Sequence, residues 1–160
     1  MLAARVGLLQ QMPIFGAVAE DALEFLLAPA PLVERPAGSF FFREGEPAES
    51  MFVLEEGQVA VSKSWQGHAL LLRRLGAGDC FGEMALLDLF PRSASVLADT
   101  QCRAIELTPA NLYRLFERDP AQFATIQMNI GREVSRRLRA TDDLLFRARM
   151  GEALEGLPRL

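Results

Sequence analysis

The chain has 160 residues, 50% of them hydrophobic, so it is long enough to bury one core and too short for two ordinary domains. Its formal net charge of −4 argues against a generally nucleic-acid-binding surface. Arg5, Gln10, Gln11 and Pro13 interrupt the apolar N-terminus, far short of the roughly 20 apolar residues that a membrane span needs. These features predict a soluble, cytoplasmic protein.

Residues that support metal, redox or catalytic chemistry are few. Cys80 and Cys102 lack CxxC spacing, so we expect two buried small hydrophobic side chains rather than a disulfide framework or a zinc site. His68 is the single histidine, and one imidazole makes neither a metal cluster nor a convincing haem site. The sequence offers no nucleophile–base pair and no paired carboxylates in a plausible catalytic turn. We therefore expect no metal, no cofactor and no enzymatic activity.

Two short helices are predicted at the N-terminus, followed by a β region. Residues 2–11 and 19–28 both place apolar side chains at helical spacing, and Pro13 separates them. Between residues 32 and 107, short apolar runs alternate with glycines, which is typical of an antiparallel sandwich or barrel. Within this region, residues 65–68 fit an exposed hairpin tip.

Helical character returns after the β region. Thr108 is the expected N-cap of a short helix, with Pro109 at its first position. A second helix starts at residues 119–120 and runs for roughly thirty residues, about 45 Å, which is longer than one small domain needs. Its apolar face comprises Phe123, Ile126, Ile130, Val134, Leu138, Thr141 and Leu145. An apolar stripe of that length predicts packing against a partner helix.

The segment from Phe81 to Val96 places a carboxylate and a guanidinium on either side of a short apolar stretch. Gly82 lets the backbone approach a ligand closely, and Glu83 can accept hydrogen bonds from a pair of hydroxyls. Arg92 can donate to the non-bridging oxygens of a phosphodiester through its fork of N–H groups. Residues 84–89 are long enough for one helical turn, whose free N–H groups favour an anion. The segment therefore suits a small ligand that carries a sugar hydroxyl and a phosphate.

This ordered set, Phe-Gly-Glu, an apolar stretch and Pro-Arg-Ser-Ala, resembles the phosphate-binding cassette of the cyclic-nucleotide-binding domain family. That family includes bacterial catabolite-activator-type regulators, protein kinase A regulatory subunits and gated channels. The likeness covers residues 10 to 148, because further glycine and apolar landmarks of the family's β-roll occur upstream in the expected order, and a short helix and then a long one follow downstream. These landmarks are Gly38, residues 43–46, residues 52–54 with Gly57, and residues 76–79.

The resemblance implies a role for each cassette residue. The implied ligand contacts are Gly82, Glu83, Met84, Arg92, Ser93 and Ala94. Glu83 would bind the ribose 2′-hydroxyl, and Arg92 would bind the phosphate together with the hydroxyl and backbone N–H groups that follow it. From the residues alone, Glu83 can instead be a surface carboxylate, and Arg92 an ordinary ion-pair partner for Asp88 or Glu83.

The base pocket that the resemblance implies comprises Val61, Leu72 and Arg73 on strands and Arg137 and Thr141 on the long helix. The apolar strand residues can equally be plain core, and the helix arginine a solvated charge. In the resembling bacterial regulators this threonine contacts adenine and a serine follows it, whereas this chain has Asp142, which can favour a ring with more donors, such as guanine. Ser93 rather than threonine follows Arg92, and this favours adenine. We therefore prefer cAMP to cGMP as the ligand.

The sequence as a whole predicts one α+β domain, mainly β, with an antiparallel β-roll or jelly roll, N-terminal helices, a short cassette helix and a long C-terminal helix. The expected segments of this single cyclic-nucleotide-binding domain, residues 1–160, are N-terminal helices in 1–31, the β-roll in 32–108 with the cassette in 81–96, C-terminal helices in 109–148 and a tail in 149–160. The residues after Leu145 are too few for a helix-turn-helix, so we expect no DNA binding by this chain alone and no membrane partner.

The function that these features predict is a regulatory sensor. It would bind a cyclic nucleotide, transmit occupancy through the C-terminal helix, form a homodimer along that helix and act on an unidentified downstream protein. The alternative is a dimerising protein-interaction module whose nucleotide pocket is degenerate or unused, because a fold does not dictate a function.

Overall fold

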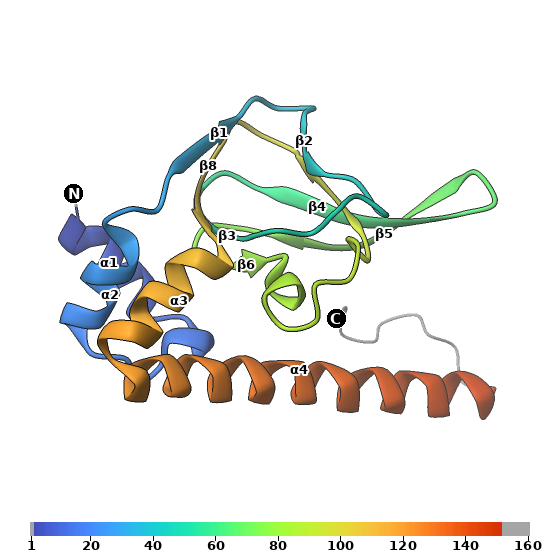
Figure 1. Ribbon diagram of the computed structural model, residues 1–160. Helices are drawn as coiled ribbons and strands as arrows, with labels where there is room; N and C mark the ends of the chain where they lie inside the picture. The colour runs from blue at the N-terminus through green and yellow to red at the C-terminus, as the bar shows by residue number, and fades with distance from the viewer. Residues whose placement is uncertain (1, 152–160) are drawn as a thin grey trace.

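The computed structural model describes residues 2–151, and it has the α+β fold that the sequence predicts (Figure 1). Helices hold 43% of the described residues and strands 27%. The helices are α1 (Leu2–Gln10), α2 (Glu20–Leu27), α3 (Pro109–Arg118) and α4 (Pro120–Arg149), with 3-10 turns η1 (Pro13–Phe15) and η2 (Glu83–Leu86). The strands are β1 (Leu32–Arg35), β2 (Phe40–Phe42), β3 (Met51–Glu56), β4 (Val59–Trp65), β5 (His68–Leu75), β6 (Cys80–Phe81), β7 (Ser95–Ala98) and β8 (Cys102–Leu107).

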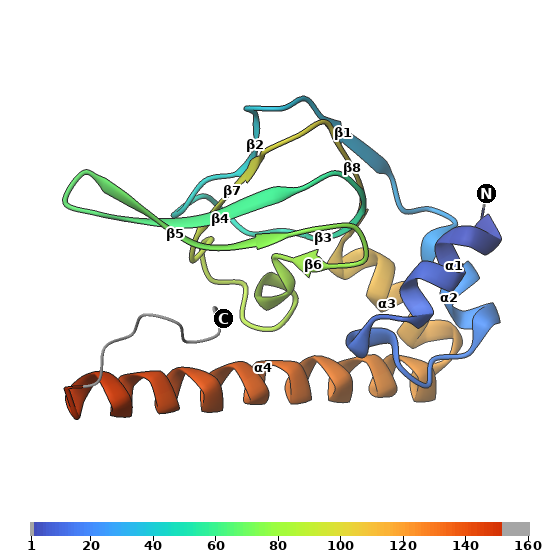
Figure 2. The ribbon, with the colours of Figure 1, turned by 180° about the vertical axis from the view of Figure 1, so that it is seen from behind.

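The strands form two antiparallel sheets with a shared core, as expected of a β-roll (Figure 2). One sheet has the order β1-β8-β3-β6 and the other the order β2-β7-β4-β5. Phe41 and Phe42 of the second sheet pack against Phe52 and Phe81 of the first, with the rings of Phe41 and Phe81 5.0 Å apart between centroids. Aromatic pairs in this geometry add to the stabilisation from apolar burial.

A second core lies between the first sheet and the helices at both ends of the chain. Residues from α1, η1, α2, α3 and the first third of α4 pack there against β3 and β8. The buried Asn129 of α4 donates from Nδ2 to the carbonyl oxygens of Ile14, at 3.3 Å, and Gly16, at 2.7 Å. These bonds fix the start of α4 against η1, because a buried amide is costly to leave without partners.

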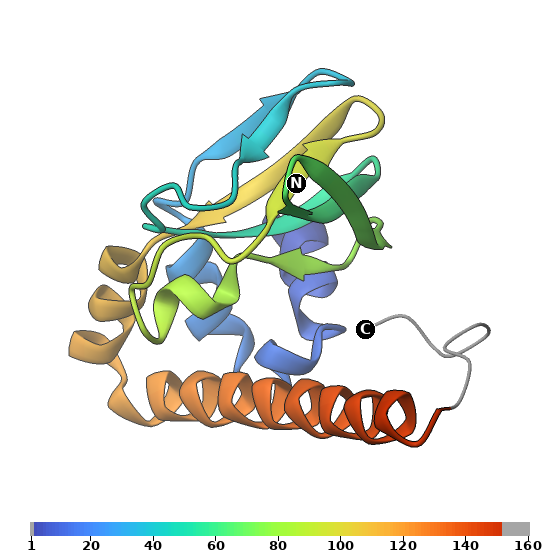
Figure 3. The same ribbon diagram turned by 90° about the vertical axis from the view of Figure 1, so that its right-hand side faces the viewer.

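The helices α3 and α4 start where the sequence predicts, and α3 has the predicted cap. The hydroxyl of Thr108 accepts from the backbone N–H of Asn111 at 3.2 Å, and Pro109 takes the first helical position. Asp119 caps α4 by accepting from the backbone N–H of Gln122 at 3.2 Å. The 30 residues of α4 extend about 45 Å beneath the whole β-roll (Figure 3). None of the described helices is long and apolar enough to cross a bilayer.

The hairpin β4–β5 extends beyond the rest of the sheet, and its tip is exposed as predicted. Gln66 and Gly67 turn the chain with positive φ values of 48° and 80°. Lower in the hairpin a β-bulge shifts the register, because Val61 pairs with Arg73 whereas Ser62 pairs with Leu71. Leu72 is the extra residue and is 37% exposed, against the expectation that a β-roll would bury it.

The two cysteines are free thiols, and they differ in burial. Cys102 lies in the central strand β8 and is buried as expected. Cys80 is partly exposed, which corrects the expectation that both are buried. The reason is that Cys80 lies in β6, a two-residue strand at the edge of its sheet.

Candidate functional site

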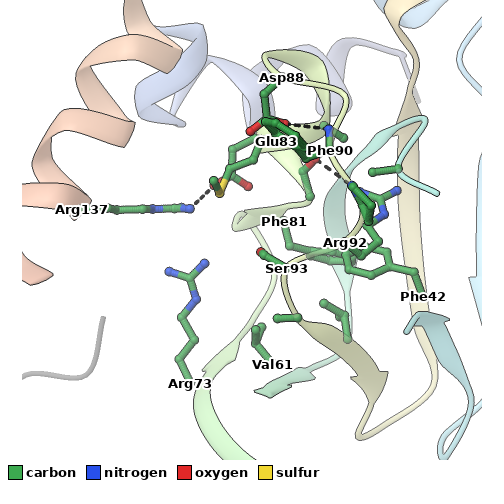
Figure 4. A pocket seen from close by; sticks show the side chains of 17 residues that line it. Phe42, Val61, Arg73, Phe81, Glu83, Asp88, Phe90, Arg92, Ser93 and Arg137 are labelled. Atoms are coloured by element: carbon green, nitrogen blue, oxygen red, sulfur yellow. Dashed lines mark hydrogen bonds and ion pairs between the residues drawn. The ribbon is translucent and has the colours of Figure 1, made fainter. Parts of the chain in front are cut away.

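A cavity of about 130 Å³ lies between the cassette, the second sheet and α4 (Figure 4). Nine of the predicted ligand contacts line it: Val61, Arg73, Gly82, Glu83, Met84, Arg92, Ser93, Ala94 and Arg137. Leu72 and Thr141 are not among the lining residues. Thr141 is exposed on α4, where its hydroxyl donates to the carbonyl of Arg137 at 2.9 Å, so a contact from either residue to a ligand stays a prediction.

Gly82 allows the cassette backbone to lie against the cavity. It precedes η2 with a left-handed φ of +78°, which glycine adopts without strain. A Cβ atom at this position would lie 2.6 Å from Nη1 of Arg92 and 3.3 Å from the carbonyl oxygen of Ser50. Glycine suits this position for two reasons: the backbone is left-handed here, and the Arg92 guanidinium occupies the space that a Cβ atom would need.

Glu83 is the first residue of η2 and is only 2% exposed. Its carboxylate accepts from Nη1 of Arg137, which reaches it from α4. Nε of Arg137 also lies 3.5 Å from the carboxylate of Glu133, one turn earlier on the helix. A buried carboxylate needs such a partner because its desolvation is costly. Glu83 is therefore not the surface carboxylate of the alternative interpretation.

Arg92 is 8% exposed and has no counter-ion among residues 2–151. Its guanidinium stacks on the ring of Phe42, 3.9 Å from the centroid, and Nη1 donates to the carbonyl of Gly82 at 3.4 Å. Its Nε is buried without any hydrogen-bond partner. The ion pair with Asp88 or Glu83 that the sequence left open is not formed. Asp88 instead accepts from the backbone N–H of Phe90 at 3.0 Å.

The pKa of Arg92 is affected by its burial without a counter-ion. Burial lowers the pKa of the guanidinium from its usual value, and the more distant carboxylates of Glu106, Glu46 and Glu49 oppose that shift. The backbone is held in place, because the N–H of Arg92 donates to the carbonyl of Glu46 at 2.9 Å and its carbonyl accepts from Gly45 at 2.8 Å. The result is a rigidly held, buried positive charge that faces the cavity.

Further donors surround the cavity. Ser93 and Ala94 follow Arg92 and make no hydrogen bonds to other residues in the described part of the chain. Arg73 enters from β5 on the side facing α4 and likewise has no ion pair there. The pKa of Arg137 is lowered by burial and then by the positive charge of Arg73, while Cys80 opposes the shift. The cavity is thus rich in donors and suited to an anion.

Some lining residues were not foreseen from the sequence. Phe42, which stacks under Arg92, was predicted only as part of a strand, and Ala48 carried no signal at all. The position of Phe42 follows from the pairing of β2 with β7, which sets Phe42 beside Val96. No group of three or more His, Cys, Asp or Glu residues that could hold a metal ion occurs among the described residues.

Comparison with known proteins points to one family. A model of the cyclic nucleotide-binding domain matches residues 32–119. A CRP-like cAMP-activated global transcriptional regulator from Mycobacterium tuberculosis is 30% identical over 144 residues, which are 87% of this chain and 62% of the regulator. The chain therefore spans about three fifths of that relative's length.

Solved structures agree with this assignment. The catabolite activator protein of Thermus thermophilus superposes with a TM-score of 0.75 at 28% identity, covering 83% of this chain and 61% of that one. A cyclic nucleotide-binding domain from Methylobacillus flagellatus shares the fold, with a TM-score of 0.79 at 21% identity over 98% of this chain and 86% of that one. This chain belongs to the cyclic nucleotide-binding domain family.

Proposed function

We propose that this chain is a regulatory receptor for a cyclic nucleotide, with cAMP preferred to cGMP, and that it acts by binding rather than by catalysis. Arg92, Ser93 and Ala94 hold the cyclic phosphate, and Glu83 accepts from the ribose 2′-hydroxyl beside Gly82 and Met84. The similarity to a regulator named as cAMP-activated supports this choice of ligand. Leu72 and Thr141 remain proposed contacts of the base, as Val61, Arg73 and Arg137 do.

The main support for this function is the buried and incompletely bonded guanidinium of Arg92. A buried guanidinium that has no counter-ion and an unpartnered Nε is energetically unfavourable in the ligand-free protein. An anion in the cavity would neutralise the charge and accept from the uncommitted donors that follow it. A cyclic phosphate supplies one negative charge and two non-bridging oxygens, which matches this need.

The size of the cavity favours a particular arrangement of the nucleotide. About 130 Å³ is close to the size of cavities that hold a benzene ring, and below the roughly 300–1,000 Å³ of clefts that enclose whole ligands. The cyclic phosphate and the sugar would therefore fill it, while the base lies towards Arg73 and α4. In this placement the base lies near Arg137, so small movements of α4 would change the contacts of the base.

Coupling between ligand and helix would pass through Glu83. Its carboxylate is already bonded to Arg137 of α4, so a ribose hydroxyl that bonds to the same carboxylate changes the partners of Arg137. A ligand shifts a conformational equilibrium only by the difference between its affinities for the two states, and this exchange of partners supplies such a difference. Occupancy of the cavity is thereby transmitted to α4.

Dimerisation along α4 completes the proposal. Ile126 and Ile130 are buried, but the same apolar face continues into Leu138 and Leu145, which are 60% and 52% exposed. An exposed apolar stripe on a long helix is typically covered by another helix. A second copy of this chain is the proposed partner, and a downstream protein would recognise the resulting pair.

Thermal denaturation and sedimentation with and without nucleotide test this function against the alternative. A receptor is stabilised by saturating cAMP or cGMP, and the dimer dissociation constant changes with ligand, because only a binding-competent fold gains free energy from the nucleotide. A dimerising module with an unused pocket shows no shift in melting temperature at millimolar nucleotide and the same dimerisation in both conditions. That second result would refute the receptor.

A further inference from the structure

A second hollow lies on the outer surface of α4, beside η1. Its volume of about 670 Å³ is within the range of clefts that enclose whole ligands, whereas the cassette cavity has only about 130 Å³. Every charged residue that lines it in the described part of the chain is an arginine. The lining includes Arg132, Arg136 and Arg139 together with Pro13, Met128 and Ser135. These residues form an arginine groove on a chain whose formal net charge is −4.

The three arginines of the groove follow one another along one face of α4. Their positions correspond to i, i+4 and i+7, so Arg132, Arg136 and Arg139 extend over about 10 Å of the helix surface. Arg139 comes two residues after Arg137, about 200° further round the helix. Since Arg137 reaches into the cassette cavity, the arginine groove is on the opposite side of α4 and separate from the nucleotide site.

Several donors in the arginine groove have no partner in the described part of the chain. Arg139 makes no hydrogen bond or ion pair to any residue between 2 and 151, and neither does the hydroxyl of Ser135. Arg136 pairs with the carboxylate of Glu133, one turn earlier on the helix. The positive charge of the groove is therefore only partly neutralised within residues 2–151, and it favours an anionic partner.

One buried amide holds the two walls of the groove together. Nδ2 of Asn129 donates to the carbonyls of Ile14 and Gly16, and its Oδ1 accepts from Nη1 of Arg132 at 3.2 Å. These bonds fix α4 against η1 and orient Arg132 with most of its N–H groups still available. At Gly131 a Cβ atom would meet nothing within 4 Å, so the floor of the groove is open to a partner. A preorganised surface of this kind lowers the entropic cost of binding.

We propose that the arginine groove is a docking site for an acidic amphipathic helix of another protein, which gives the downstream protein of the proposed function a place and a chemistry. Carboxylates at i, i+4 and i+7 of that helix would face the three arginines. Its apolar side chains would contact Pro13 and the exposed Met128, whose flexible thioether adapts to a partner surface. Arginine and methionine are both enriched at protein interfaces, and a helix in a groove is a common mode of recognition.

Nucleic acid and a second copy of the chain fit the arginine groove less well. A nucleic acid is repelled by the net charge of the whole chain, whereas a short acidic helix meets mainly the local arginines. Two-fold pairing across this face would set each arginine against the same arginines of the second copy. Leu138, in the stripe of the proposed dimer, lies about 100° from Arg139, so that dimer uses a different face of α4.

Fluorescence anisotropy with a labelled peptide is the first test of the groove. The probe is an alanine-rich helical peptide of about 15 residues, with glutamates at i, i+4 and i+7 and leucines beside them. The comparison peptide has glutamines in place of the glutamates. We expect the full chain to bind only the glutamate peptide, and more weakly as salt is added. No binding of that peptide, equal binding of both peptides, or tighter binding of a DNA duplex of the same charge would overturn the inference.

Charge reversal locates the contact. Arg139→Glu should raise the dissociation constant of the glutamate peptide about 2- to 30-fold, because it removes one exposed ion pair and adds a repulsion of similar size. Arg149→Glu is the control, since it makes the same change of charge on α4 outside the groove. A peptide with lysine in place of one end glutamate should restore binding to Arg139→Glu. Equal effects of the two variants, or no restoration, would contradict the assignment.

Filling the groove separates a shaped site from general electrostatic attraction. Ser135→Trp leaves every charge in place and puts a large ring into the hollow, so we expect an unchanged melting temperature and loss of peptide binding. Full binding by a folded Ser135→Trp chain would overturn the docking site. None of these measurements uses a nucleotide, so the docking site can fail while cAMP binding is observed, or hold while the receptor proposal fails.

Discussion

Arg137 of α4 donates to the buried carboxylate of Glu83, 54 positions earlier in the chain, at the side of the cavity that faces the helix. This bond links the turn η2 of the cassette to the longest element of the fold. It also means that the carboxylate expected to accept from a ribose is already held by α4. Any ligand hydroxyl that reaches Glu83 therefore changes the environment of the helix.

Replacing Glu83 with Gln should weaken cAMP binding about 10-fold or more, because the charged acceptor of the ribose hydroxyl is lost. The sharper test compares cAMP with 2′-deoxy-cAMP by calorimetry. We expect the unmodified chain to prefer cAMP and Glu83→Gln to bind both ligands with similar affinity. Glu133→Gln is the control, since it leaves the Glu83–Arg137 pair in place. A full preference for cAMP in Glu83→Gln would contradict the assigned role.

Gly82→Ala should abolish nucleotide binding, and Gly67→Ala should not. Both glycines have a φ near +80°, so each alanine costs about 1–2 kcal/mol of folding free energy through the left-handed backbone. Only at Gly82 does the added Cβ also approach Nη1 of Arg92, at 2.6 Å, whereas Gly67 has open space around it. Urea denaturation measures the loss of folding free energy that the two variants share. Calorimetry measures the difference between them in nucleotide binding. Equal binding by the two variants would show that the position of Arg92 does not matter.

Arg92→Met should lose at least about 100-fold in cAMP affinity while leaving the ligand-free chain as stable or more stable. The methionine keeps apolar contact with Phe42 and removes a buried charge that has no counter-ion. Melting temperatures without nucleotide check the stability, and titration checks the affinity. A strong fall in the ligand-free melting temperature would mean that Arg92 stabilises the fold through a partner of its own.

The raised pKa of the Cys80 thiol should make the free energy of unfolding depend on pH. Folding raises its pKa from 9.0 to about 11, first because the thiol, although Cys80 is partly exposed, is largely shielded from water, which disfavours the thiolate. Between these values the unfolded chain releases its proton before the folded chain, so the free energy of unfolding falls as the pH rises, by about 2 kcal/mol at pH 11. Below pH 9 the contribution is fully present. Denaturation curves between pH 8 and 11 measure the slope.

Cys80→Ala is the control for that slope and should remove most of it. Cys102 has a raised pKa as well, chiefly through burial, so a smaller dependence in the same direction should remain. An unchanged slope in Cys80→Ala would assign the effect to other groups.

Local signals explain which parts of the fold were predictable. The cap at Thr108 and the apolar period of α4 act within a few residues, and both were read correctly from the sequence. The lining of the cavity by Glu83 and Arg92 followed from the cassette motif because the whole motif is contiguous. The exposure of Leu72 was not predictable, since the bulge depends on how β4 pairs with β5.

Long-range contacts account for the rest of what the sequence did not reveal. The bond between Glu83 and Arg137, and the stacking of Arg92 on Phe42, join residues on different elements. Either partner alone looks like an ordinary surface charge or core residue. Only the packing of α4 under the cassette and the pairing of β2 with β7 bring them together.

Calorimetric titration of cAMP into the chain and into Arg92→Met decides whether the cavity is a nucleotide site that depends on this arginine. We expect saturable binding at one site per chain, with heat that disappears in the variant because the phosphate has lost its charged partner. Absence of binding of either cAMP or cGMP at millimolar concentration, or equal affinity in the two proteins, would contradict it.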